Sequence, residues 1–227
     1  MNWQTYWAAL AHDPDPQRQV ARTRVGQPVD EETLGQIVAC ISERLALRPE
    51  DHLLDVCCGN GVLTRHLALI CRETVGVDIS PPHIRLARAQ HTAPGLTYLT
   101  GDATRLGDVL DSTFDKICLY FSFQYLDTYA KGLLAIQGMA RLLKPGGRIL
   151  LGDVPDSARL RVFFPRWQDR ARYYLQVASG RSPMGKFWSA DEIRRIAAAC
   201  GLRVSVLSQP THLPYASYRT DYVLTWI

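Results

Sequence analysis

Short apolar runs rich in β-branched residues alternate with amphipathic segments from residue 51 onward. Each run is nearly continuous in apolar residues, which is typical of a strand buried on both sides. The runs predict strands at residues 52–58, 73–79, 95–100, 114–121 and 147–154. Apolar residues spaced three and four apart predict helices between them, at residues 62–70, 82–90 and 129–143. This alternation indicates a parallel sheet that is covered by helices on both faces.

The end of the chain departs from that alternation. Ser189 and Glu192 have the spacing of a capping box, and they open a predicted helix that ends at Gly201. Two further apolar runs follow, at residues 203–208 and 217–227, with about ten residues and no helical pattern between them. A connection this short favours an antiparallel pair at the edge of the sheet.

Two segments lie outside the regular pattern. Residues 1–50 precede the first strand and read as a mainly helical leader, with a break at Asp13-Pro14-Asp15-Pro16. Residues 155–188 interrupt the pattern after the fifth strand. We therefore expect an N-terminal leader or cap over residues 1–50 and a main domain over residues 51–227, with an inserted lid at 155–188.

Composition narrows the class of protein. The chain has 227 residues, of which 47% are hydrophobic and 21% charged, as in an ordinary globular domain. Its formal net charge of +4 is too small to suggest a nucleic-acid partner. Because apolar runs stay short of the ~20 residues that a membrane helix needs, we expect no membrane partner.

The six cysteines indicate structural thiols. Most of them lie inside apolar runs, where a free cysteine behaves as a small hydrophobic residue. No pair has C-x-x-C spacing, so we expect no metal site. Free thiols and the lack of a basic start to the chain favour a cytoplasmic protein.

Candidate chemistry lies where the predicted strands end. Asp55-Val56-Cys57-Cys58-Gly59-Asn60-Gly61 follows the first strand, and its glycines allow a tight turn and close approach of a ligand. Strand two ends in Asp78, about 20 residues on, a spacing at which an acid commonly binds ribose hydroxyls. Strand three is followed by Gly101-Asp102-Ala103. Since parallel strands end at one edge, these acids should face one crevice.

Two alternatives use the same crevice. A nicotinamide-binding domain would carry Gly-x-Gly-x-x-Gly, but Thr64 stands three positions after Gly61. A non-catalytic nucleotide-binding module would need only the glycine turn and the acids.

The ordered set resembles class I S-adenosylmethionine-dependent methyltransferases over about residues 53–227. "LDVCCGNG", "VGVDIS" and "GDATRL" resemble the first three motifs of that family, and "LLKPGGRILLGD" resembles the segment that enters its fifth strand. One departure is Cys57, where the family has glycine in D-x-G-x-G-x-G. The resemblance implies an α/β fold with a Rossmann-like, doubly wound sheet of seven strands, mostly parallel with an antiparallel last strand. It implies S-adenosylmethionine as the cofactor.

The resemblance also implies roles for individual residues. Gly59 and Gly61 would flank the amino-acid portion of the cofactor, and Asp55 would orient the loop or the methionine ammonium. Asp78 would bind the ribose and Ile79 would pack on adenine. The remaining expected cofactor contacts are Arg22 (to the methionine carboxylate), Cys57, Asn60, Asp102, Ala103 and Tyr120.

On the acceptor side, the chain predicts a small molecule, with oxygen as the first choice of methylated atom and nitrogen or carbon as alternatives. "YFSFQYL" replaces the Asp/Asn-Pro-Pro-Tyr of nucleic-acid and amide methyltransferases. Methyl transfer from a sulfonium depends mainly on placement, and a base is needed only when the acceptor must lose a proton. Candidate bases are His12, Asp153 and His212. Expected acceptor contacts are Trp3, Trp7, Ser122, Gln124, Tyr125, Arg166, Arg170 and Trp188.

The predicted lid is basic and aromatic. Residues 155–188 carry seven Lys and Arg against two Asp, a net charge of +5. Arginine suits carboxylate or phosphate, so we expect an anionic acceptor such as a phosphorylated sugar or another acidic metabolite. The alternative is a solvated charged helix with its aromatic residues facing inward. The sequence leaves open whether the protein is a monomer or a homodimer.

Overall fold

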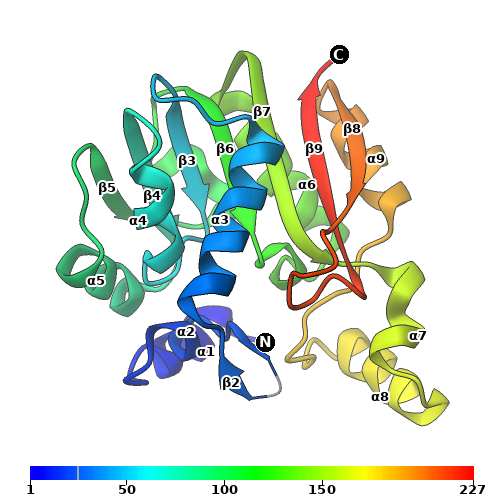
Figure 1. The fold of residues 1–227 in the computed structure, drawn as a ribbon. Coiled ribbons are helices and arrows are strands. Elements are labelled where there is room, and N and C mark those ends of the chain that lie inside the picture. The colour runs from blue at the N-terminus through cyan, green and yellow to red at the C-terminus, as the bar shows by residue number, and fades with distance from the viewer. Residues whose placement is uncertain (25) are drawn as a thin grey trace.

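Seven strands form one sheet in the order β5-β4-β3-β6-β7-β9-β8 (Figure 1). The computed structural model describes residues 1–24 and 26–227. The strands are β3 (His52–Val56), β4 (Glu73–Asp78), β5 (Leu96–Thr100), β6 (Phe114–Tyr120), β7 (Leu143–Pro155), β8 (Leu202–Ser208) and β9 (Arg219–Trp226). The first five are mutually parallel, whereas β9 lies between β7 and β8 and is antiparallel to both. The predicted seven-stranded, mostly parallel Rossmann-like sheet is confirmed.

The helices that connect the strands begin and end close to the predicted residues. They are α4 (Val62–Ala68), α5 (Pro81–Gln90), α6 (Tyr129–Leu142) and α9 (Ala190–Ala199). The capping box predicted for α9 is present, because Ser189 accepts from the Glu192 N–H and Glu192 accepts from that of Ser189. α5 begins with proline, which is favoured in the first turn because the backbone N–H of that position makes no hydrogen bond within the helix.

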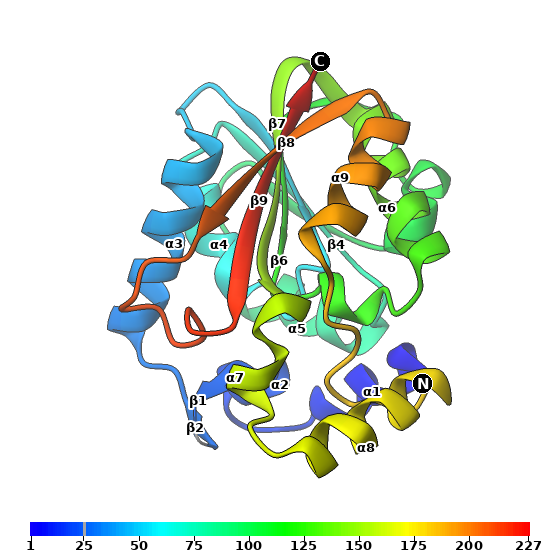
Figure 2. The same ribbon diagram turned by 90° about the vertical axis from the view of Figure 1, so that its right-hand side faces the viewer.

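Helices cover both faces of the sheet and enclose two main cores (Figure 2). On one face, α3 (Glu31–Leu45) and α4 bury Leu34, Ile41 and Leu67 against β3, β6 and β7. On the other face, α6 and α9 pack against the sheet together with the 3₁₀ turn η1 (Ala103–Asp108). The central strands are therefore buried on both sides, as their continuous apolar runs require.

The leader folds into short elements below the carboxyl ends of the parallel strands (Figure 1). It contains α1 (Trp3–Leu10), α2 (Pro16–Gln19) and the two-residue strands β1 (Thr23–Arg24) and β2 (Gln27–Pro28) before α3. The break predicted at residues 13–16 is the start of α2, where Asp15 caps the N–H groups of Gln17 and Arg18. The small hairpin was not predicted.

The insertion after β7 lies at the same end of the sheet (Figures 1 and 2). It consists of the 3₁₀ turn η3 (Ser157–Arg159), α7 (Leu160–Phe163) and α8 (Trp167–Ala178). Leu160, Tyr173 and Phe187 form a small core of their own beneath these helices. Among the described residues, none of the helices has the length and apolar character needed to cross a bilayer.

Candidate functional site

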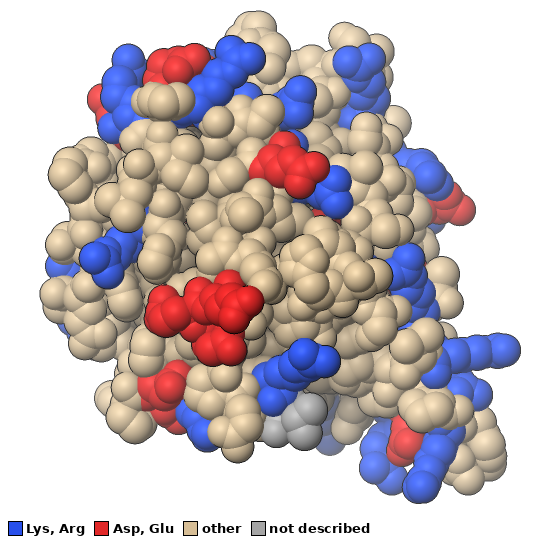
Figure 3. Space-filling view, in the orientation of Figure 1, with Lys and Arg blue, Asp and Glu red and all other residues tan. Residues whose placement is uncertain are grey.

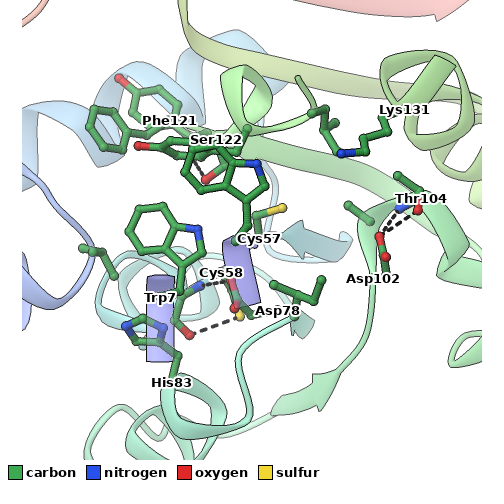
Figure 4. A pocket seen from close by; sticks show the side chains of 18 of the residues that line it. Trp7, Cys57, Cys58, Asp78, His83, Asp102, Thr104, Phe121, Ser122 and Lys131 are labelled. Atoms are coloured by element: carbon green, nitrogen blue, oxygen red, sulfur yellow. Dashed lines mark hydrogen bonds between the residues drawn. The ribbon is translucent and has the colours of Figure 1, made fainter. Parts of the chain in front are cut away.

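A cavity opens at the carboxyl ends of β3, β4 and β5, where the sequence placed its glycine loop and acids (Figure 4). The leader and the segment after β6 complete its walls. The lining residues are Trp3, Trp7, Val20, Arg22, Cys57, Cys58, Gly59, Asp78, Ile79, His83, Asp102, Ala103, Thr104, Tyr120, Phe121, Ser122, Tyr125, Leu126 and Lys131. The cavity therefore brings together residues from the leader, from the ends of four strands (β3 to β6) and from α6.

Several residues of the loop after β3 adopt the left-handed backbone conformation, with positive φ, which glycine tolerates best. Gly59 and Gly61 have φ of +57° and +81°. A Cβ on Gly61 would lie 2.5 Å from the Tyr98 hydroxyl oxygen, so that position is also closed by packing. Cys57, the departure from the family pattern, adopts φ of +62°. This left-handed conformation explains why glycine suits that position, and holding a cysteine there costs about 1 kcal/mol or more.

Asp78 ties the ends of two strands together. Its carboxylate accepts hydrogen bonds from the Gly59 N–H at 2.9 Å and the Ser80 N–H at 2.8 Å. Burial raises the pKa of Asp78, while these two donors act in the opposite direction. The side chain thus fixes the glycine loop against β4 and still lines the cavity.

The other two strand-end acids have different surroundings. Asp55 is buried behind the glycine loop, and its carboxylate accepts from the Thr64 hydroxyl at 2.6 Å. Burial raises the pKa of Asp55 to about 7. Asp102 lines the cavity and caps η1, accepting from the Thr104 N–H and hydroxyl at 2.8 Å each.

Buried polar contacts hold the leader against the loop. The Asn60 amide donates to the Pro16 carbonyl at 2.8 Å and to the Gln19 side chain at 2.7 Å. His83, in the first turn of α5, contacts the Gln19 carbonyl oxygen through Nε2 at 3.0 Å. Asn60 therefore faces the leader, and it is not among the residues that line the cavity.

Arg22 brings a buried guanidinium to the cavity wall. Its Nη1 donates to the Gln17 side chain at 3.0 Å, but its Nε has no partner among the described residues. Burial lowers the pKa of Arg22, against the attraction of Asp55, Asp153 and two tyrosines. A buried cation with an unused donor is suited to an anionic group of a ligand.

Aromatic rings form the wall contributed by α1. The rings of Trp3 and Trp7 lie 4.6 and 5.0 Å from that of Tyr125, which ends the 3₁₀ turn η2 (Phe123–Tyr125). The Trp7 ring lies 6.3 Å from that of His83. Figure 4 shows Trp7 and His83 on one side of the cavity, with Asp102, Thr104 and Lys131 on the other.

Several residues expected at the site lie elsewhere. His12 and His212 are exposed and do not line the cavity. Gln124 and Trp188 are buried, donating to the carbonyls of Phe121 and Phe123. Arg166 is exposed at the start of α8, and Arg170 donates to two carbonyls ahead of that helix.

Asp153 belongs to a buried ionic network beside the cavity. It has φ of +56°, and its carboxylate lies 3.3 Å from Nη1 of Arg219. Its own N–H donates to the carboxylate of Asp221 at 2.8 Å. Burial raises the pKa of Asp153 to about 6. The group is not among the cavity-lining residues.

The sequence did not single out several lining residues. His83 was interpreted as structural, but it lies in the first turn of α5, five residues after Asp78 at the end of β4, and its side chain lines the same cavity. That spacing was the available signal. Thr104 and Lys131 are two further polar side chains that line the cavity and that the sequence did not single out.

Within residues 1–24 and 26–227, no cluster of three or more metal-ligating side chains occurs.

Comparison with known proteins agrees with this geometry. Residues 54–151 match the family model of a methyltransferase domain. An uncharacterized methyltransferase of Synechocystis is 37% identical over 112 residues, which are 49% of this chain and 51% of the relative. A ubiquinone biosynthesis O-methyltransferase of Cereibacter sphaeroides is 25% identical over 153 residues, 66% of this chain and 59% of that protein. The chain spans about half the length of curated relatives that it matches.

A solved structure shows the same fold at lower identity. Magnesium protoporphyrin IX methyltransferase from Synechocystis superimposes with a TM-score of 0.64 at 17% identity, covering 98% of this chain and 94% of the other. The residues that match the family model, 54–151, include the glycine loop, Asp78 and Asp102. Residues 54–151 therefore match a methyltransferase domain, and the chain as a whole has the fold of this solved methyltransferase.

Proposed function

We propose that this protein transfers a methyl group from S-adenosylmethionine to a small-molecule acceptor. The proposal depends on the cavity. Residues that follow β3, β4 and β5 all line it, and all of them lie within the segment that matches a methyltransferase domain. The solved relative from Synechocystis holds S-adenosylhomocysteine. When bound, S-adenosylmethionine supplies a methyl group on a sulfonium, which is already activated for transfer.

The residues around the cavity suit this cofactor. Asp78 presents a buried carboxylate to the space where ribose hydroxyls would lie, and Ile79 offers an apolar side for adenine. Asp102 and Ala103 line the adjoining edge. Arg22 has an unused Nε donor for the methionine carboxylate, and Asp55 lies behind the loop, where it can orient it.

Placement is the main contribution of the chain to catalysis. The Asp78 contacts fix the glycine loop, while Asn60 and His83 hold the leader over it. Such a preformed site orders the reacting groups before they meet, which lowers the barrier. Trp3, Trp7 and Tyr125 would exclude water from the same space.

The acceptor is proposed to be a small molecule with a flat, largely apolar body. Trp3, Trp7, Phe121 and Tyr125 provide aromatic faces to the cavity. None of the seven basic residues of 155–188 is among the described lining residues, so these residues do not support the prediction of an anionic acceptor. Oxygen remains our proposed methylated atom, because one relative of known type is an O-methyltransferase.

An acceptor that must lose a proton needs a general base within the cavity. His12, His212 and Asp153 do not line the cavity, whereas His83 does. Its Nδ1 has no partner among the described residues, and burial lowers the pKa of His83, which keeps the ring neutral. His83 is therefore the histidine that could accept a proton at this site.

Calorimetric titration with S-adenosylmethionine tests the cofactor assignment. Asp78→Asn should weaken binding by about 1–3 kcal/mol, because a charged acceptor is lost. The matched control is Asp111→Asn, which changes an exposed carboxylate away from the cavity. Wild-type affinity in Asp78→Asn would remove the ribose assignment. Release of S-adenosylhomocysteine with candidate acceptors then separates an enzyme from a non-catalytic module.

A further inference from the structure

The outward face of α8 is apolar although it faces solvent. Trp167, Tyr174 and Leu175 are 67%, 60% and 73% exposed. Together with the exposed Ala171 and Ala178, they follow helical spacing, so all five lie on one side of the helix. We call these five residues the α8 stripe. Large exposed apolar patches of this kind commonly mark interaction sites.

The stripe is not needed to hold α8 in place. The opposite side of the helix packs into the core of the insertion through the buried Tyr173, whose ring lies 5.4 Å from those of Phe164 and Phe187. The Tyr173 hydroxyl also accepts from the Phe187 N–H at 2.8 Å. Because these contacts anchor the helix, its outer residues are available to a partner.

Arginines surround the α8 stripe. Arg161 on α7 and Arg166 precede it, Arg172 flanks it and Arg181 follows it, and all four are exposed. None of them has an ion-pair partner in the part of the chain that the structure describes. Figure 3 shows this group of basic side chains at the lower right, where α7 and α8 project from the molecule. The partner should therefore be both anionic and apolar.

We propose that α7 and α8 dock this protein onto an anionic lipid surface. Tryptophan and tyrosine favour the boundary between headgroups and acyl chains, and arginines are attracted to acidic headgroups. The helix projects from the molecule (Figure 3), and none of the five residues of the α8 stripe lines the cavity described above, which suits a broad surface better than an inserted peptide. Two copies meeting through this face would place the arginines of one against those of the other.

The docking helix borders the catalytic side of the molecule. The Lys186 N–H, just beyond α8, donates to the carbonyl of Gln124 at 2.8 Å, and Gln124 stands between the cavity residues Ser122 and Tyr125. The proposal replaces the expectation of no membrane partner with peripheral attachment. It does not depend on methyl transfer, so either proposal can fail without the other.

Co-sedimentation of the full chain with lipid vesicles tests the docking. We expect binding to vesicles of phosphatidylcholine with phosphatidylglycerol, weak binding to phosphatidylcholine alone, and loss of most binding as ionic strength rises from about 0.1 M to 1 M. Trp167→Gln with Leu175→Gln, and separately Arg166→Gln with Arg172→Gln, should each weaken binding by about tenfold or more.

Matched pairs control for general surface effects. Leu69→Gln with Leu134→Gln alters exposed apolar residues on α4's end and α6, and Arg141→Gln with Arg195→Gln removes exposed cations elsewhere. Both control proteins should bind the acidic vesicles like wild type. The proposal is overturned if wild type binds neither vesicle, if the α8 variants bind like wild type, or if the α8 stripe instead mediates self-association that Trp167→Gln with Leu175→Gln abolishes.

Discussion

Asp55 is a buried carboxyl group whose ionisation opposes folding. Burial raises its pKa to about 7, whereas an exposed aspartate titrates near 4. The folded protein therefore retains a proton that the unfolded chain has released across that range. Linkage requires the free energy of unfolding to fall as pH rises from about 4 to about 7, by an amount on the order of 4 kcal/mol from this group.

Asp55→Asn should make that decline shallower, because an amide cannot ionise. Urea unfolding of the cofactor-free protein at pH 5 and pH 7 measures the difference. A residual slope is expected, since burial also raises the pKa of Asp153, to about 6. Asp111→Asn should leave the slope as in wild type. An equal slope in Asp55→Asn and wild type would show that Asp55 ionises normally.

Single residues also mark where sequence patterns stop being informative. The presence of apolar and aromatic residues in a sequence does not distinguish the wall of a cavity from the hydrophobic core. Trp188, for example, was expected to contact the acceptor, but it lies fully buried against Phe123. His83 shows the converse: its pattern looked structural, yet the first turn of α5 points it into the cavity. In both cases the position of the side chain depends on how helices and strands pack against each other. The identity of a single residue in the sequence does not reveal that packing.

At the scale of elements, strands and helices with strong patterns were predictable. Strands β3 to β7 were buried apolar runs, and α9 carried its capping box in the sequence. The β1–β2 hairpin was not predictable, because two-residue strands have no periodicity and this one is held by tertiary contacts such as the Tyr215 hydroxyl on the Thr23 carbonyl at 2.6 Å. A charged helix with an aromatic inner face was one of two alternatives for residues 155–188, and the apolar outer face of α8 was not predicted.

The leader and the glycine loop are coupled through Asn60. Asn60→Ala removes two buried hydrogen bonds to residues 16 and 19 and the acceptor for the Val62 N–H at 3.2 Å. Each buried partner left unsatisfied costs about 1–3 kcal/mol, so we expect lower stability in urea and faster tryptic cleavage at Arg18. Weaker cofactor binding should accompany the release of the leader.

Asn2→Ala is the matched control for this experiment. Asn2 caps α1 in the same leader but is exposed, with its side chain accepting from the Thr5 N–H at 3.2 Å. Its loss should affect α1 slightly and leave cleavage at Arg18 unchanged. If Asn60→Ala is cleaved no faster than Asn2→Ala, the leader is held by other contacts.

Three parts of the whole molecule meet at one end of the sheet. The glycine loop and acids follow the parallel strands, the leader covers them, and the inserted helices stand beside them (Figure 1). Parallel strands explain this concentration, because all their carboxyl ends share one edge. A ligand that bridges the loop and the leader should therefore stabilise the molecule as a unit.

Differential scanning calorimetry with S-adenosylhomocysteine measures that effect. At a concentration about a hundred times its Kd, a ligand that binds only the folded state adds about 2.7 kcal/mol. For a chain of this size, that corresponds to a rise in Tm of roughly 5–10 °C. NADH should give no rise, since the loop has Thr64 where a nicotinamide-binding turn has glycine. Asp78→Asn should reduce the rise at the same ligand concentration, because the weaker complex contributes less. A rise with NADH that equals the rise with S-adenosylhomocysteine would show that the cavity does not discriminate against a dinucleotide.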